Sequence, residues 1–182
     1  MKKIYLTLAF TIITNLTISA QDALTFEKII QTDSISKEKL FVAFNDWVAS
    51  EYNSANDVIQ MSDKDAGVII GNGSMKYSYG KFTYVCYDGH IKYTIKVYLK
   101  DNKYKVILTN FRHFINAGNG AQCKLGLITN ADVYATKGFS KKYHNKVWNS
   151  IKSTTEIYAN KIFSSLEDKT KNMSNKSTDQ DW

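Results

Sequence analysis

Proline is absent from this chain of 182 residues, and cysteine and histidine are scarce, with two and three copies respectively. The lack of proline removes one common way of ending helices and of protecting the edge strands of a sheet. His90, His113 and His144 form no HxxxH or HExxH spacing, and no cysteine stands close enough to complete a zinc site. The sequence also has no nucleophile-elbow or phosphate-loop motif, so we expect no metal, no cofactor and no catalytic residues.

Two short segments look like ligand-binding motifs but have the wrong spacing. Residues 63–67 (DKDAG) resemble the start of a calcium loop, which needs glycine at its sixth position and glutamate at its twelfth. Here the glycine is fifth and the twelfth residue is serine, so we interpret this segment as a tight turn. Residues 71–73 (GNG) lack the GxGxxG spacing and are interpreted as a bulge or bend in a strand.

The longest apolar run lies at the N-terminus. Residues 1–20 contain two lysines near their start, continue with a largely apolar segment and end in Ser19-Ala20. This order is typical of a secretory signal peptide, and we predict cleavage after Ala20, with an uncleaved N-terminal anchor as the alternative. No cysteine stands at the cleavage site, so a lipid-anchored lipoprotein is not expected. Because no later run approaches the roughly 20 apolar residues that cross a bilayer, we expect an exported protein, periplasmic or secreted, with no transmembrane segment after cleavage.

The charge balance is basic. The formal net charge is +7, and removal of residues 1–20, which carry two lysines and no acidic residue, lowers it to +5. In an exported chain this balance favours an anionic partner such as lipid head groups, lipopolysaccharide or acidic glycans, and it argues for no nucleic-acid partner. A basic, well-solvated surface without a ligand is the alternative.

Two segments have the apolar spacing of amphipathic helices, namely residues 37–52 and 140–166. Residues 33–36 offer N-cap candidates for the first helix. Residues 167–182 are polar, and we expect them to form a disordered tail. The expected core positions of the two helices are Leu40, Phe41, Phe44, Trp47 and Val48, followed by Val147, Trp148, Ile151, Thr155, Tyr158, Ile162 and Leu166.

The other apolar segments predict strands, which cover residues 24–31, 57–62, 68–79, 81–87, 91–100 and 103–110. Asp88-Gly89 and Asp101-Asn102 are interpreted as two-residue hairpin turns, so the last three strands form an antiparallel meander. Residues 111–139 are expected to form a long loop. The order of elements predicts a single α+β domain of residues 21–166, with the helices packed on one face of the sheet.

The two turns place one set of side chains on a common buried face. Around the first turn the expected opposite pairs are Cys86 with Ile91, Tyr84 with Tyr93 and Phe82 with Ile95. Around the second they are Leu99 with Tyr104, Val97 with Val106 and Ile95 with Leu108. All of these residues are apolar or aromatic, so the register is well specified, because a slip of one residue would move them into water.

The opposite face of the meander gathers lysine beside tyrosine. The register places Lys100 across from Lys103, and like charges directly opposite each other are destabilising. Such a cluster suits an anionic or glycan-like partner. The alternative is a solvated face whose lysines discourage aggregation at the sheet edge. The candidate residues of this anionic-partner face are Lys92, Lys96, Tyr98, Lys100, Lys103 and Lys105.

Cys86 and Cys123 are the two cysteines. A pair of cysteines in an exported chain suggests a disulfide, which would contribute roughly 3–4 kcal/mol to stability on the chain-entropy model. The expected register instead directs Cys86 toward the core opposite Ile91, where a free cysteine would act as a small hydrophobe. Both states of the pair therefore stay open.

The order of elements over about residues 24–166 resembles a family of uncharacterised exported proteins of Gram-negative bacteria, with a fold like that of the TATA-box-binding protein. The features that carry the resemblance are Trp47, the turn at 63–69 before residues 71–73, the hairpin at 100–104, and Trp148 with Ile151. Asn102, where the family often has glycine, and the long segment 111–139 depart from the pattern. The resemblance implies the TBP-like fold and no activity, and the name of the fold suggests nucleic-acid binding only by analogy.

Together, these observations predict a non-enzymatic, exported binding or interaction module of the cell envelope. Its partner would be an anionic envelope component or another envelope protein, bound on the sheet face or on the 111–139 segment. The second possibility is a purely structural accessory protein of the envelope. The third is an envelope hydrolase, which a pocket that joins His113 to acidic residues would favour.

Overall fold

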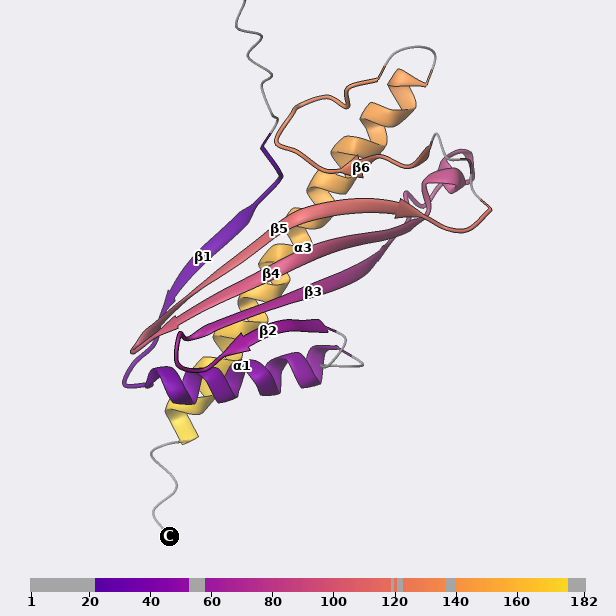
Figure 1. Ribbon diagram of the computed structural model, residues 1–182. Coiled ribbons are helices and arrows are strands. Elements are labelled where there is room, and N and C mark those ends of the chain that lie inside the picture. The colour runs from indigo at the N-terminus through magenta and orange to yellow at the C-terminus, as the bar shows by residue number, and fades with distance from the viewer. Residues whose placement is uncertain (1–21, 53–57, 119, 121–122, 137–139, 177–182) are drawn as a thin grey trace, which may run out of the picture.

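The computed structural model describes residues 22–52, 58–118, 120, 123–136 and 140–176. The expected signal peptide of residues 1–20 and its cleavage site lie outside these residues. The elements follow the order β1 (Phe26–Gln31), α1 (Lys37–Glu51), β2 (Ile59–Asp63), β3 (Val68–Tyr77), the 3-10 helix η1 (Phe82–Tyr87), β4 (Gly89–Lys100), β5 (Lys103–Ile115), β6 (Gly126–Leu127) and α3 (Lys141–Lys176) (Figure 1).

The strands form one antiparallel sheet of six strands in the order β1-β5-β4-β3-β2, and β6 also pairs with β5. The hairpin at Asp101-Asn102 is confirmed, since Lys100 lies opposite Lys103 and the expected pairs beyond them keep the same register. Asn102 has a φ of 63°, a left-handed conformation that asparagine adopts more readily than most residues. The turn residues therefore fix the register of β4 and β5.

Both helices cover one face of this sheet, and in Figure 1 the strands run in front of α3. The Phe44 ring of α1 packs edge-on against Tyr104 of β5, with ring centroids 4.9 Å apart. Trp47 links the two helices, because its Nε1 donates a hydrogen bond to Ser165 Oγ at 2.9 Å. The expected apolar stripes are confirmed, with Leu40, Phe44, Trp47, Val48, Val147, Trp148, Ile151, Thr155, Ile162 and Leu166 all buried.

The strand expected at residues 81–87 is wrong, because this segment forms the 3-10 helix η1. The partner of β4 on this side is β3, which places Met75, Gly73 and Gly71 opposite Ile91, Tyr93 and Ile95. The expected pairs of Cys86, Tyr84 and Phe82 with β4 therefore do not form. The segment is rich in strand-forming residues, but Tyr84 and Tyr87 are buried at the i, i+3 spacing of a 3-10 turn, whereas Phe82 is 92% exposed.

The glycines of β3 do not mark a break in the strand, as the sequence suggested, because β3 pairs with β4 without interruption from Val68 to Tyr77. A Cβ atom on Gly73 would overlap the ring of Tyr93 on the neighbouring strand. Gly73 therefore makes room for the large buried side chain opposite it. The segment 63–67 is the expected tight turn, with Ala66 N donating to Asp63 Oδ1 at 2.8 Å.

Two further boundaries differ from the expectation. The segment 111–139 is not a continuous loop, since β5 runs on to Ile115 and β6 lies at Gly126–Leu127. The helix expected to end at residue 166 continues to Lys176, so residues 167–176 are helical and the expected disordered tail is wrong there. Residues 177–182 lie outside the described part of the chain. None of the described helices is long and apolar enough to cross a membrane.

Candidate functional site

The face of the sheet opposite the helices carries the predicted anionic-partner residues. Along β4 the buried side chains from Ile91 to Leu99 alternate with more exposed ones, as expected for a strand with one face in the core. We call this second surface the open face. Its central side chains are Val68, Ile70, Asn72 and Ser74 from β3, Lys92, Thr94, Lys96, Tyr98 and Lys100 from β4, and Lys103, Lys105, Ile107, Thr109, Arg112 and Phe114 from β5.

Five of the six predicted residues gather at the hairpin end of the open face. Lys100 lies opposite Lys103, and Tyr98 lies opposite Lys105. Lys105 is neutralised by Glu27 of β1, with 2.9 Å between Nζ and Oε2. Neither Lys100 nor Lys103 takes part in an ion pair among the described residues. This end therefore combines excess positive charge with Tyr98, which is 39% exposed.

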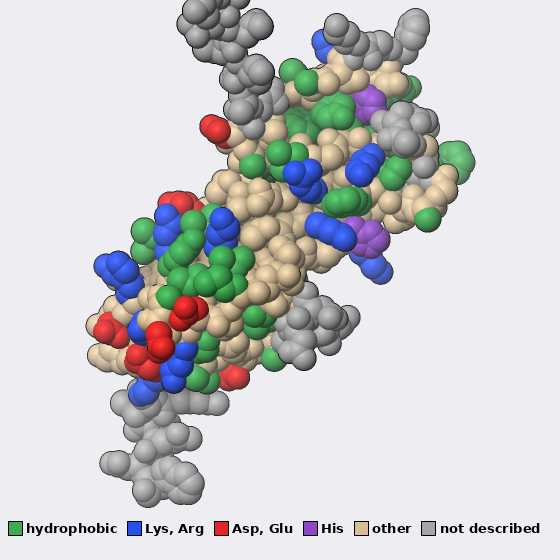
Figure 2. Space-filling model, in the orientation of Figure 1, with side chains coloured by type: hydrophobic (Ala, Val, Ile, Leu, Met, Phe, Trp, Pro, Cys, Tyr) green, Lys and Arg blue, Asp and Glu red, His purple; other side chains and the backbone are tan. Residues whose placement is uncertain are grey.

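Lys92 lies at the other end of the open face, in a shallow hollow of about 440 Å³. We call this the Lys92 hollow. The sequence did not predict it, because the strand was expected to end at residue 110 with a long loop beyond it. Figure 2 shows Lys and Arg side chains in two groups on this side of the molecule, with an uncharged band between them. The side chains that line the hollow are Asn72, Lys92, Thr94, Asn110, Arg112 and Phe114.

The cations at the Lys92 hollow lack acidic partners. Lys92 lies directly opposite Arg112 across the β4–β5 pair, an arrangement of like charges that destabilises a sheet. The ammonium groups of Lys92 and Lys124 lie 5.2 and 4.9 Å from the centroid of the Phe114 ring, so the same π system attracts both. The described residues form two ion pairs, and neither includes these cations or Arg112.

A β-bulge shapes this hollow. Thr94 pairs with Thr109 and Lys92 pairs with Arg112, so Asn110 and Phe111 together oppose the single residue Tyr93. Asn110 has a φ of 57°, which is uncommon for a residue other than glycine. Bulges of this kind bend the strand and redirect side chains, and they recur near functional sites. The bulge thus returns Arg112 and Phe114 to the open face after the break in register.

The disulfide and a buried histidine hold Lys124 in place. Cys86 of η1 and Cys123 form a disulfide, with Cα atoms 5.8 Å apart. The objection from the expected register disappears because Cys86 belongs to a 3-10 helix and does not face Ile91. On the other side of Lys124, the backbone N–H of Leu125 donates to His113 Nδ1 at 3.3 Å. Lys124 is therefore anchored on both sides next to Phe114.

His113 is fully buried and serves the fold. Its Nε2–H donates to the carbonyl oxygen of Tyr87 at 2.9 Å, while Nδ1 accepts from Leu125. Burial lowers its pKa below the usual value of 6.5, although the bond to Tyr87 opposes that shift. The neutral ring thus uses both nitrogens. His144 is also buried, and its Nδ1 lies 3.1 Å from the hydroxyl oxygen of Tyr87. Neither geometry has the pocket of histidine and acids that the hydrolase possibility called for.

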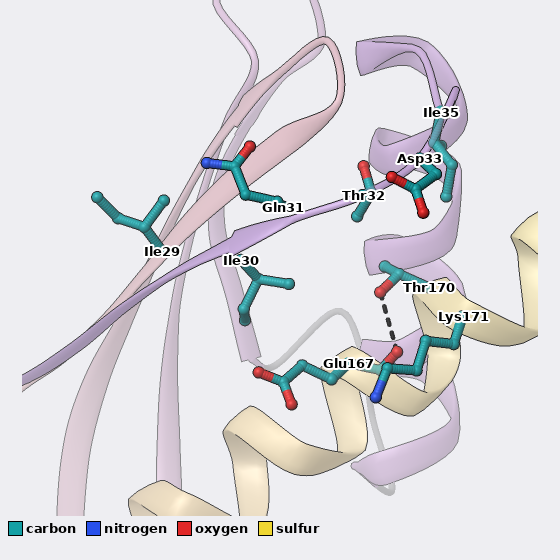
Figure 3. Close-up of a pocket in the computed structure, with 9 residues that line it drawn as sticks. All are labelled: Ile29, Ile30, Gln31, Thr32, Asp33, Ile35, Glu167, Thr170 and Lys171. Atoms are coloured by element: carbon teal, nitrogen blue, oxygen red, sulfur yellow. Dashed lines mark hydrogen bonds between the residues drawn. The ribbon is translucent and has the colours of Figure 1, made fainter.

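A second concavity, of about 610 Å³, lies between β1, the loop after it and the last turns of α3. Figure 3 shows Ile30, Thr32 and Ile35 near Thr170 and Lys171 of α3, while Ile29 points away from the helix. The hydroxyl oxygen of Thr32 is buried without a hydrogen-bond partner among the described residues. Glu167, which also lines this groove, pairs with Lys28 of β1 at 2.5 Å. None of the predicted site residues lies here, and the described part of the chain holds no group of three metal-binding side chains anywhere.

Two solved structures share this fold. A TBP-like protein from Parabacteroides distasonis matches with a TM-score of 0.55 and 18% identity, over 80% of this chain and 93% of that one. A DUF4468 family protein from Bacteroides ovatus matches with a TM-score of 0.57 and 18% identity, over 81% of this chain and 86% of that one. The protein therefore has the TBP-like α+β fold that the resemblance implied.

The family is also defined by sequence. Residues 26–114 match the family described as "Domain of unknown function (DUF4468) with TBP-like fold". The chain thus carries a DUF4468 domain, and no function is established for that family. The match includes β1 to β5 as far as Phe114, but it ends before Lys124. Comparison with curated proteins gives no match.

Proposed function

We propose that this protein is an exported, non-enzymatic binding module of the cell envelope, and that its open face binds an anionic envelope component. One observation carries the proposal. The open face holds like charges directly opposite each other at both of its ends, Lys100 with Lys103 and Lys92 with Arg112. Such pairs weaken a sheet when no anion lies between them, so a bound anion would relieve the repulsion.

Export is supported by the signal-like N-terminus and by the disulfide. Disulfides persist in oxidising compartments and are rare in the cytosol. The compartment, periplasmic or secreted, is tested by isolating the native protein from cell fractions and determining its N-terminus by mass spectrometry. A mature chain that begins at Gln21 supports the proposal, and a chain retaining residues 1–20 contradicts it.

The binding function is tested by charge reversal on the open face. In the first variant Lys96, Lys100 and Lys103 become glutamate. A matched control carries the same charge change on the exposed face of α3, at Lys141, Lys142 and Lys146. Binding to lipopolysaccharide, and to vesicles with and without an anionic lipid, is measured by co-sedimentation.

We expect the open-face variant to lose most of its binding, because three attractive charges become repulsive, while the control keeps most of it. An equal loss in both variants would mean that net charge alone governs binding. Unchanged binding in the open-face variant would remove the hairpin end from the interface. If neither probe binds the wild-type protein under low salt, the structural accessory role becomes the better account.

A further inference from the structure

We propose that the Lys92 hollow is a binding site for a phosphate group carried on a sugar. This inference rests on the proposed function, since it names one site on the open face and the chemistry of its ligand. The hollow lies apart from the hairpin end, where most of the lysines predicted from the sequence are found. It is lined by donors from three strands, and its cations have no acidic partner among the described residues.

The first argument concerns charge and geometry. Arg112 supplies a planar guanidinium, whose paired N–H groups suit two oxygens of one phosphate. Lys92 lies directly across from it, and the ammonium of Lys124 approaches from the segment beyond β5. The Phe114 ring attracts both ammonium groups. Three cations on one side of a hollow therefore surround a space that a single dianion can neutralise.

The second argument concerns the neutral side chains around these cations. Asn72 Oδ1 accepts a hydrogen bond from Thr94 Oγ1 at 3.2 Å, which leaves the amide N–H₂ group of Asn72 as a donor toward the hollow. Asn110 adds a second amide. Amides and hydroxyl groups match the hydroxyl groups of a sugar rather than acyl chains. The exposed apolar side chains Ile29 and Tyr98 lie instead toward the hairpin end.

The third argument is that several features with an energetic cost occur at this one place. The bulge interrupts the ladder, Asn110 adopts a left-handed conformation, and Lys92 faces Arg112. Each weakens the sheet on its own, and such outliers tend to occur at functional sites. A ligand that bridges the two cations would compensate for part of this cost.

The test is an NMR titration of the ¹⁵N-labelled mature chain, with its disulfide intact, using glucose 1-phosphate, inorganic phosphate and glucose at constant ionic strength. We expect saturable shifts of the Lys92, Thr94 and Arg112 amides with glucose 1-phosphate, weaker binding of inorganic phosphate, and no saturation with glucose. Arg112→Gln should weaken binding at least about tenfold, since it removes a charge-assisted hydrogen-bonding group. Arg112→Lys should recover only part of it. Lys96→Gln, at the hairpin end, should leave the affinity within about twofold.

The outcomes separate this inference from the proposed function. The inference is overturned if the wild-type shifts do not saturate, if they centre outside the hollow, or if Arg112→Gln binds as tightly as the wild type. Equal affinity for inorganic phosphate and glucose 1-phosphate would overturn the sugar assignment. In any of these cases, loss of vesicle or lipopolysaccharide binding in the hairpin-end variant would still support the proposed function. All variants change exposed side chains, and their amide spectra report whether the fold is intact.

Discussion

At the residue scale, Gly73 is required by a neighbour on the next strand rather than by its own backbone. Tyr93, opposite it, is only 2% exposed, and its hydroxyl group lies 2.8 Å from that of Tyr52. Because the ring is held from several sides, it cannot move away from an added methyl group. We expect Gly73→Ala to lower the free energy of unfolding by about 1–3 kcal/mol, as overpacking does. Urea denaturation measures this, with Ser74→Ala on the open face as a control that should change little.

The buried His113 makes stability depend on pH. Its pKa in the folded protein is lowered below 6.5, mainly by burial, so the unfolded chain binds more protons as the pH falls through that value. The free energy of unfolding should therefore be fully maintained above about pH 6.5 and decrease below it, until the folded-state pKa is passed. Each unit of lowering corresponds to about 1.4 kcal/mol.

The contribution of His113 is isolated by comparing variants between pH 7 and pH 5. His113→Gln should be less stable at pH 7 but lose less further stability on acidification. His90 is exposed, so His90→Gln should keep the slope of the wild type. His144 also has a pKa lowered by burial, so some slope should remain in His113→Gln. A slope unchanged by His113→Gln would contradict the assignment.

At the element scale, the disulfide connects η1 to the segment that carries Lys124. The 37 residues between Cys86 and Cys123 correspond to about 4 kcal/mol on the chain-entropy model. We expect the Cys86→Ser, Cys123→Ser double variant to lose roughly that amount in urea denaturation. It should also bind glucose 1-phosphate more weakly, because Lys124 loses one of its two anchors. A stable variant with unchanged affinity would show that the bond positions nothing at the hollow.

How far the sequence predicted each element depended on whether the evidence was local. The hairpin at Asp101-Asn102 could be predicted from its turn residues, and the two helices from their apolar stripes. Residues 82–87 could not be assigned this way, because their strand-forming composition is overridden by burial of two tyrosines at 3-10 spacing. The missed hollow has a similar cause. Arg112 and Phe114 alternate with buried Phe111 and His113, but the extra residue of the bulge hides that alternation.

At the scale of the whole molecule, the sheet separates two functions. The face under α1 and α3 holds the aromatic core, with Phe44, Tyr93 and Tyr104 against the helices. The open face carries little that the core needs, so its charges can change without unfolding the protein. This separation explains why the sequence predicted the location of five of the six lysine-face residues well while indicating nothing of the ligand. It also makes the binding surface separable from the fold by experiment.

The central claim, that the open face binds an anionic envelope component, is tested most directly by lysine footprinting. The rate at which each lysine is acetylated is measured by mass spectrometry, with and without lipopolysaccharide, on the intact mature chain. We predict slower acetylation at Lys92, Lys96, Lys100 and Lys103 when lipopolysaccharide is present, with unchanged rates at Lys141, Lys142 and Lys146 on α3. Protection of the α3 lysines with the open-face lysines unprotected would contradict the claim.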